Sequence, residues 1–359
     1  MNQTKKLLII AGGSGGHVFP GLSIAHHLKS KNWKIHWLGT SDHIESVLVP
    51  KNGINIDFIN ISSFRNKTFK VIIKFPWNIY KAIQQAKKII KQYKPNIALG
   101  MGGYVSGPGI IAAWQCGIPI ILHEQNGIAG LTNKILSYIT KNILQASPGA
   151  FKNAHVVGNP IRKEILNIPS PEERMLKRNG AIRILVLGGS QGADILNQTI
   201  PTIVSKIKKQ LIILHQSGKG NKEKTKILYK NQNSNNFKYK IIEFIENIDQ
   251  AYAWADIVIC RSGALTVSEI ASVGLPAIFI PYPHKDHQQY WNAIPLEKAG
   301  AAKILHQQLF TSDAVAKLLN ILDRKKLLLM AKNAHNCAIN NATNNISKII
   351  CKIANKQII

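Results

Sequence analysis

The chain carries one local pattern twice, a short apolar run that ends in a glycine-rich loop. Residues 7–17 read LLIIAGGSGGH, and residues 184–193 read ILVLGGSQGA. A buried strand that passes through glycines into a helix is typical of parallel α/β sheets, because glycine permits tight turns and close backbone approach. The repetition predicts an α/β fold of two Rossmann-like parallel-sheet domains facing a central cleft, with ligands at the carboxyl ends of the strands.

Short apolar runs alternate with longer amphipathic ones along the 359 residues, a length that suits two domains. Helices are expected over 21–30 and over 70–93, the second with a break at Pro76. The pattern restarts after a polar stretch with two prolines, so the domain boundary is expected near residues 163–180. The expected strands are 6–11, 34–38, 54–59, 97–100, 119–123, 142–145, 183–187, 211–215, 240–243, 257–260 and 277–281.

Four glycine loops follow expected strands, at 12–16, 100–109, 188–192 and 262–264. Such loops bind anions, because a helix N-terminus presents unpaired N–H groups there. No phosphate-loop ATPase motif or dinucleotide fingerprint is present. The pattern G-x-S-x-G occurs in both the first and the third loop, so a serine hydrolase remains an alternative. It would use Ser190 as the nucleophile, with Asp256 or Asp286 and with His287.

The charge is strongly basic, with 46 Lys and Arg against 18 Asp and Glu. The excess indicates a polyanionic partner, such as nucleic acid, an anionic membrane or a phosphorylated substrate, unless it reflects the drift toward lysine of an AT-rich genome. The four cysteines are scattered, which argues against a zinc site or disulfide framework and suits a reducing compartment. The uncharged stretch 97–122 contains too many glycines and prolines for a transmembrane helix, and the apolar run near the N-terminus is too short for a secretory signal.

Five sequence blocks resemble the MurG family of bacterial glycosyltransferases. They are GGSGGHVFPGLSIA at 12–25, residues 100–134 from GMGGYVSGPG to GLTNK, GNPIR at 158–162, LGGSQGADILN at 187–197, and residues 252–293 from YAWADIVICRSGALTVSEI to QQYWNA. The resemblance implies a GT-B fold, with an acceptor domain at 1–163 that includes a C-terminal helix at about 340–359. The donor domain would be 164–339.

The resemblance implies inverting, metal-independent transfer of N-acetylglucosamine from UDP-GlcNAc to the 4-hydroxyl of lipid I, which gives lipid II in peptidoglycan synthesis. No cofactor is implied. The enzyme would work as a peripheral protein on the cytoplasmic face of the bacterial inner membrane, in contact with its anionic surface and with other cell-wall synthesis proteins. A nucleic-acid-binding module, driven by charge alone, is the third hypothesis, although no basic recognition helix or aromatic RNA motif is present.

The resemblance also implies roles for individual residues. His17 and Glu124 are rival candidates for the base that deprotonates the acceptor. Gly102, Gly103 and Tyr104 would contact the acceptor. The donor would be bound by Ser14, Gly15, Gly16, Asn126, Arg162, Ser190, Ile245, Ala264, Leu265, Thr266, Val267, Ser268, Glu269, Gln288 and Gln289, with Ile245 on uracil, Glu269 on the ribose hydroxyls and Ser190 on the diphosphate.

Residues 64–83 interleave aromatic and aliphatic side chains with lysines. The mixture is typical of an interfacial membrane segment, and an amphipathic helix packed on the sheet would look the same. Residues 1–163 hold 20 basic and only 4 acidic side chains, and no acid occurs from 58 to 123. The charge is therefore concentrated in the domain expected to meet lipid I, so a membrane surface and two diphosphates are favoured over nucleic acid.

Overall fold

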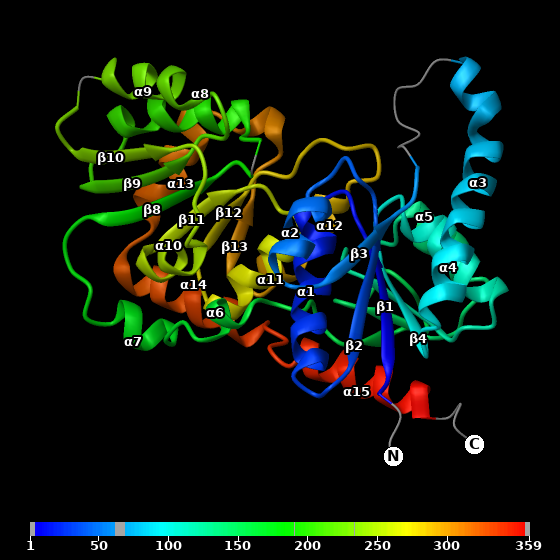
Figure 1. Ribbon diagram of the computed structural model, residues 1–359. Coiled ribbons are helices and arrows are strands. Elements are labelled where there is room, and N and C mark those ends of the chain that lie inside the picture. The colour runs from blue at the N-terminus through cyan, green and yellow to red at the C-terminus, as the bar shows by residue number, and fades with distance from the viewer. Residues whose placement is uncertain (1–3, 62–68, 190, 233, 356–359) are drawn as a thin grey trace. The chain divides into compact units, whose positions relative to one another are not determined.

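The computed structural model describes residues 4–61, 69–189, 191–232 and 234–355, and gives the backbone alone for 69–75. The chain divides into two compact units (Figure 1). Unit 1 comprises 1–162 together with 339–359, and unit 2 comprises 163–338.

Unit 1 contains a seven-stranded, all-parallel sheet in the order β3-β2-β1-β4-β5-β6-β7. Its strands are β1 (Lys6–Ala11), β2 (Lys34–Gly39), β3 (Asn55–Phe58), β4 (Ile97–Gly102), β5 (Ile120–Glu124), β6 (Ile143–Gln145) and β7 (His155–Val156). Its helices are α1 (Gly15–Lys29), α2 (Glu45–Lys51), α3 (Phe69–Tyr93), α4 (Ser106–Gln115), α5 (Leu131–Leu136) and α15 (Ala342–Asn355). The strand order reverses between β1 and β4, which is where ligands bind in doubly wound sheets.

Strand β1 explains why this sheet is covered on both faces. Its residues from Leu7 to Ala11 are buried, and successive side chains enter two different hydrophobic clusters. Leu7 and Ile9 pack with α1 and α15, whereas Leu8 and Ile10 pack with α3 and α4. Successive side chains of a β-strand point to opposite faces of the sheet, and in β1 both faces are buried.

Helix α15 joins the C-terminal segment to unit 1. Ile346, Ile350 and Ala354 are buried at a spacing of four residues, and the helix packs against α1. An amphipathic helix buries such a stripe against another apolar surface, so the end of the chain is bound to the unit in which the chain begins.

Unit 2 contains a six-stranded, all-parallel sheet in the order β10-β9-β8-β11-β12-β13. Its strands are β8 (Ile182–Leu187), β9 (Leu211–Gln216), β10 (Phe237–Ile242), β11 (Ile257–Cys260), β12 (Ala277–Phe279) and β13 (Ala302–Ile304). Its α-helices are α6 (Lys163–Leu166), α7 (Pro171–Met175), α8 (Asp194–Ile203), α9 (Lys222–Lys230), α10 (Ile248–Trp254), α11 (Ala264–Val273), α12 (Gln288–Lys298), α13 (Ser312–Ile321) and α14 (Arg324–Asn336).

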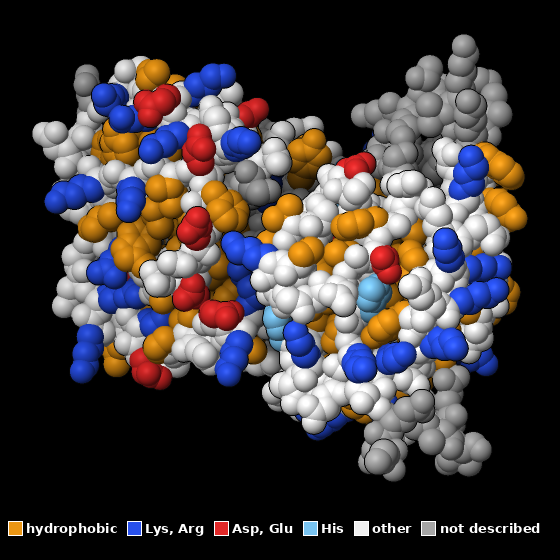
Figure 2. Space-filling view, viewed as in Figure 1, with side chains coloured by type: hydrophobic (Ala, Val, Ile, Leu, Met, Phe, Trp, Pro, Cys, Tyr) orange, Lys and Arg blue, Asp and Glu red, His pale blue; other side chains and the backbone are white. Residues whose placement is uncertain are grey.

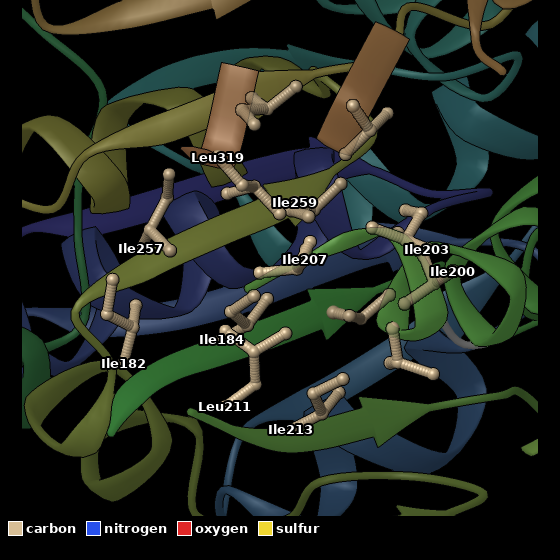
Figure 3. Packing of buried hydrophobic residues seen from close by; sticks show 14 of the residues in the cluster. Ile182, Ile184, Ile200, Ile203, Ile207, Leu211, Ile213, Ile257, Ile259 and Leu319 are labelled. Carbon is tan, nitrogen blue, oxygen red and sulfur yellow. The ribbon is translucent and has the colours of Figure 1, made fainter. Parts of the chain in front are cut away.

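Aliphatic side chains fill the core of unit 2 (Figure 3). Ile184 on β8 pairs with Ile213 on β9 and with Ile257 on β11, so the three side chains share one face of the sheet, and Ile200 and Leu319 from two covering helices belong to the same cluster. The β-branched isoleucine suits both the strand and the pleated surface on which it packs.

The expected fold class of two parallel-sheet domains is confirmed, whereas the expected break in a helix is wrong and two strands were missed. Helix α3 continues through Pro76 without a break. The following turns bury Ala82, Ala86 and Ile90, and this burial offsets the backbone hydrogen bond that the proline cannot make. The short edge strands β7 and β13 were not expected. Runs of two or three residues lack the length from which a period can be recognised.

Candidate functional site

The first glycine loop connects β1 to α1 at the point where the strand order reverses. Ser14 takes the N-cap position in an extended conformation, and His17 lies in the first turn of the helix. Glu45, at the start of α2, is fully buried behind this loop. Its carboxylate accepts hydrogen bonds from the amide of Gly13 at 3.0 Å and from the amide and hydroxyl of Thr40 at 3.1 and 2.6 Å.

The loop after β4 lies against the first glycine loop. Gly102 and Gly103 both have positive φ values, of 101° and 84°. A Cβ atom on Gly102 would lie 2.6 Å from Nδ1 of His17, and one on Gly103 would lie 2.2 Å from the carbonyl oxygen of Gly12. Both positions therefore require glycine for conformation and for space. Tyr104 follows them and is 38% exposed.

The His17 ring is held through Nδ1. This nitrogen lies 3.0 Å from the carbonyl oxygen of Met101 and 3.2 Å from Oε1 of Gln125. Its Nε2 has no hydrogen-bond partner among the described residues, and the residue is partly exposed. The ring thus presents Nε2 as the nitrogen through which it can act on a ligand.

Glu124 ends β5 and is only 2% exposed. Its Oε1 accepts hydrogen bonds from the backbone and side-chain amides of Asn126, both at 3.0 Å. Its Oε2 accepts from the amide of Gly130 at 3.1 Å and from Nδ2 of Asn133 at 2.8 Å. A carboxylate has about four acceptor sites, so these bonds occupy it fully.

Next to Glu124, His123 anchors the segment that carries the GNPIR motif. Its Nε2 donates to the carbonyl of Gly158 at 2.9 Å, and burial lowers the pKa of His123 to about 4. In the same segment, Nδ2 of Asn159 donates to the carbonyl of Gln125 at 3.3 Å. The guanidinium of Arg162 lies 4.9 Å from the ring centre of Phe19 on α1, a cation–π contact.

In unit 2, the second glycine loop connects β8 to α8, and its residue Ser190 lies outside the described residues. Gln216, at the end of β9, donates from Nε2 to the carbonyl of Gly189 at 2.8 Å. Its Oε1 accepts from the amide of Ile245 at 3.2 Å, and the Ile245 side chain is buried. One side chain therefore connects the glycine loop to the residue expected at uracil.

Helix α11 starts after Gly263 and contains the expected donor residues 264–269. Leu265, Val267 and Glu269 are buried, whereas Ala264, Thr266 and Ser268 are partly exposed. Oε2 of Glu269 accepts a hydrogen bond from the hydroxyl of Tyr252 at 3.1 Å. The helix thus carries two groups that can bind a ligand, the Glu269 carboxylate on its side and the first-turn backbone amides at its N-terminal end.

At the start of α12, the two expected glutamines differ in their contacts. Oε1 of Gln289 accepts from the amides of Ser262 at 3.3 Å and Tyr282 at 2.9 Å, so it joins the loops before α11 and α12. The amide of Gln288 donates to Asp286 at 3.3 Å.

Comparisons with known proteins identify the family. The model of the glycosyltransferase family 28 N-terminal domain matches residues 7–145, and that of the family's C-terminal domain matches residues 183–350. The chain belongs to glycosyltransferase family 28. These matches include both glycine loops and every candidate site residue except Arg162.

Family 28 relatives align over nearly the full length. Proteins of Proteus mirabilis and Photorhabdus laumondii are each 56% identical over 99% of both chains. Both are named UDP-N-acetylglucosamine–N-acetylmuramyl-(pentapeptide) pyrophosphoryl-undecaprenol N-acetylglucosamine transferase. The crystal structure of Acinetobacter baumannii MurG superposes with a TM-score of 0.86 at 36% identity, covering 97% of this chain and 99% of that one. The calicheamicin glycosyltransferase CalG4, at 12% identity and a TM-score of 0.66, shares the fold alone.

Within this glycosyltransferase family 28 chain, the geometry removes Asp256 from the serine hydrolase alternative. Asp256 is buried just before β11, at the amino ends of the parallel strands, whereas the glycine loop follows the carboxyl end of β8. Its carboxylate forms ion pairs with Arg178 at 2.8 Å and Arg324 at 2.6 Å. Asp286 contacts His284 at 2.7 Å, and His287 occupies the N-cap of α12 with a φ of 50°. The acid at Asp256 therefore cannot serve a nucleophile that follows β8.

Sequence reasoning missed Glu45, Gln125 and Gln216, which support the loops of this family 28 site. For Gln125 and Gln216 the available signal was a polar residue at or just after the carboxyl end of a strand, whereas Glu45 lies at the start of α2, six residues beyond β2. Within residues 4–61, 69–189, 191–232 and 234–355, no cluster of three metal-ligating side chains is found. No helix in these ranges is long and apolar enough to cross a membrane.

Proposed function

We propose that the chain transfers N-acetylglucosamine from UDP-GlcNAc to the 4-hydroxyl of MurNAc in lipid I, undecaprenyl-pyrophosphoryl-MurNAc-pentapeptide. The product is lipid II, and the reaction serves peptidoglycan synthesis, with inversion at the anomeric carbon and without a metal. The observation that carries the proposal is the 56% identity, over 99% of both chains, to relatives whose name states this transfer.

In this reaction His17 acts as the general base. Its Nε2 accepts the proton of the MurNAc 4-hydroxyl while the hydroxyl oxygen bonds to the anomeric carbon. The bond from that carbon to the diphosphate breaks, and UDP leaves with the electron pair. The close approach of Gly102 to the His17 ring supports this role, because it fixes the ring where the two glycine loops of unit 1 meet.

Glu124 serves the same site as an organiser of the loop that follows β5. All of its acceptor sites are used by Asn126, Gly130 and Asn133, so accepting a substrate proton would break hydrogen bonds within the loop. A buried carboxylate that loses such partners carries a large desolvation penalty. Between the two rival bases, these contacts favour His17.

The donor binds to the loops of unit 2 that Gln216 and Gln289 hold together. Backbone amides of the second glycine loop and of the start of α11 bind the diphosphate, and Ser190 and Arg162 contribute a hydroxyl and a positive charge. Glu269 binds the ribose hydroxyls and Ile245 the uracil. Because Oε1 of Gln289 is already used by two backbone amides, its contact with a sugar hydroxyl comes from its NH₂ group. Ser14 at the N-cap of α1, with Gly15 and Gly16 in its first turn, also contributes to donor binding.

The enzyme acts as a peripheral protein at the cytoplasmic face of the inner membrane, and unit 1 contacts the anionic surface. Trp77 and Tyr80 on α3 are 57% and 51% exposed, with rings stacked 5.5 Å apart, and the ammonium of Lys81 lies 5.4 Å from the Trp77 ring. Trp114 on the neighbouring α4 is 52% exposed. Figure 2 shows Lys and Arg side chains along the described part of α3, with hydrophobic side chains beside them. Residues 64–68 of the expected membrane segment lie outside the described residues.

Transfer of labelled N-acetylglucosamine from UDP-GlcNAc to a short-chain lipid I analogue, without added divalent metal, tests the proposal. The wild-type chain forms a product of lipid II mass, and His17→Gln lowers kcat by about 10²–10⁴-fold while UDP binding is retained. Folded wild-type protein that binds UDP-GlcNAc and yields no product would overturn the assigned reaction.

A further inference from the structure

Gln125 lies directly after β5 and touches both the base and the strand behind it. Its side chain is only 4% exposed. Its Nε2 donates to the carbonyl oxygen of Met101 at 2.6 Å, and its Oε1 lies 3.2 Å from Nδ1 of His17. Since Nδ1 is also 3.0 Å from the Met101 oxygen, the three groups form a closed triangle of contacts.

The donors and acceptors of this triangle permit one arrangement of hydrogens. The Met101 carbonyl can only accept, so the nitrogen of the Gln125 amide must face it and the amide oxygen must face His17. Turning the amide over would place two oxygens against each other at 2.6 Å. Nδ1 of His17 then faces two acceptors and carries a hydrogen. In the neutral imidazole the lone pair is therefore on Nε2.

We propose that Gln125 is a positioning residue that fixes the Nδ1–H tautomer of His17 and so makes Nε2 the proton-accepting nitrogen. The catalytic part of this inference rests on the proposed transferase function, whereas the tautomer is a property of the free protein. When Nε2 takes the substrate proton, Nδ1–H keeps both acceptors, so the imidazolium forms without a change of ring orientation.

The other ionisable groups near the ring do not replace Gln125. His123 and Glu124 follow each other on β5, and burial lowers the pKa of His123 to about 4, so it is neutral at working pH. Glu124 is bound by its own loop, and Glu45 lies on the far side of Gly12 and Gly13. Arg162 is placed over Phe19, two residues further along α1. None of these groups is in hydrogen-bond contact with the described His17 ring.

The tautomer is tested by nitrogen NMR on full-length protein labelled with ¹⁵N-histidine, with the His17 signals assigned by their loss in His17→Gln. We expect a protonated Nδ1 and an unprotonated Nε2 in the neutral wild-type ring, and a measurable share of the opposite tautomer in Gln125→Leu. A wild-type ring protonated on Nε2 would overturn the proposal. This readout needs no substrate, so it stands or fails independently of the transfer reaction.

The catalytic consequence is tested by the pH profile of kcat/KM. Gln125→Glu puts a negative charge against Nδ1–H and stabilises the imidazolium, so the acidic limb of the profile moves up by about one pH unit. Its second carboxylate oxygen replaces the Nε2 donor and is repelled by the Met101 carbonyl, so the carboxylate turns away from that carbonyl while it stays next to the ring. Gln125→Leu leaves the ring with one acceptor, and kcat falls about ten- to a hundredfold while KM for UDP-GlcNAc stays unchanged. Gln115→Glu adds the same charge at an exposed position on α4 and is the matched control. A profile of Gln125→Glu that coincides with that of Gln115→Glu would refute the positioning role.

Discussion

The carboxylate of Glu45 holds the amide of Gly13 at 3.0 Å, so a buried acid supports the first glycine loop from inside unit 1. One amide of this loop is therefore bound within the protein and is not available to a ligand. The remaining oxygen of Glu45 binds Thr40, which follows β2. The loop beside β1 is thus fixed by the neighbouring strand before any substrate arrives.

Glu45→Gln is expected to destabilise unit 1 and to raise KM for the acceptor, lipid I. The amide has one oxygen in place of two, so either Gly13 or Thr40 loses its acceptor, at a cost of about 1–3 kcal/mol. Urea unfolding measures the loss, and steady-state kinetics should give a higher KM for lipid I with an unchanged KM for UDP-GlcNAc. Glu164→Gln, at an exposed position, is the control. Equal stability of the two variants would contradict the assigned contact.

Glu124→Gln is expected to lower stability by about 1–3 kcal/mol and to leave the acidic limb of the pH–rate profile in place. The reason is that its four hydrogen bonds hold the loop from Asn126 to Asn133, whereas His17 takes the substrate proton in the proposed reaction. Unfolding curves and the profile of kcat/KM measure the two effects. If the acidic limb vanished in this variant and persisted in His17→Gln, Glu124 would be the base.

Gln216→Leu is expected to raise KM for UDP-GlcNAc about tenfold without changing KM for lipid I. The substitution keeps the approximate size of the side chain and removes the bonds to Gly189 and Ile245, so the glycine loop loses its connection to the residue proposed to bind uracil. Equilibrium binding of UDP checks the same effect without the acceptor. Unchanged UDP affinity would show that Gln216 has no part in the donor site.

Acid is expected to destabilise the protein before its carboxylates protonate. Burial lowers the pKa of His123 to about 4 and that of His215 to about 3, both from 6.5. Both histidines bind protons more readily in the unfolded chain than in the folded one. Their contribution to the free energy of unfolding is therefore fully present above pH 6.5 and is lost as the pH falls below it. Between pH 7 and pH 5 the free energy of unfolding should fall by roughly 2 kcal/mol for each histidine.

Urea titrations at the two pH values measure this loss, and His215→Gln should reduce it. His26→Gln provides the comparison, because it removes an exposed histidine in place of a buried one. A wild-type protein equally stable at both pH values would contradict the burial of the two rings.

The sequence predicts the two sheets well because their central strands are uninterrupted apolar runs that end in glycines, as in β1 and β8. It also places His17 in the loop and helix start that follow one strand and Glu124 at the end of another, where sites of this fold are found. It cannot separate their roles, because the difference lies in contacts between residues far apart in the chain. Glu124 is saturated by residues within nine positions, but His17 is oriented by Met101 and Gln125, more than 80 positions away.

The tripeptide His123–Glu124–Gln125 makes long-range contacts that the hydrophobic periodicity of the sequence cannot predict. Its three side chains bind three separate segments, the GNPIR segment at Gly158, the loop up to Asn133, and the ring of His17. In the sequence it is only a polar end to an apolar strand. The resemblance to a known family implies a role for Glu124, whereas the role proposed for Gln125 rests on its contacts with Met101 and His17.

Removing the exposed aromatic rings of α3 is expected to weaken membrane binding. Trp77 and Tyr80 present more than half of their surface to solvent next to lysines, which suits insertion into the headgroup region of an anionic bilayer. The double substitution Trp77→Ser with Tyr80→Ser should reduce binding to anionic phospholipid vesicles by at least about tenfold, since each large side chain contributes roughly 1.5–3 kcal/mol when buried. Cosedimentation measures the change, and added salt should weaken wild-type binding because it screens the lysines.

Two further measurements separate membrane contact from catalysis. Activity on a water-soluble lipid I analogue should survive the double substitution, whereas activity on long-chain lipid I in vesicles should fall. Trp291→Ser removes a comparably exposed tryptophan, 48% exposed, from unit 2 and should leave vesicle binding unchanged. Equal losses of binding in the two variants would mean that exposed tryptophan in general, and not this face of α3, contacts the bilayer.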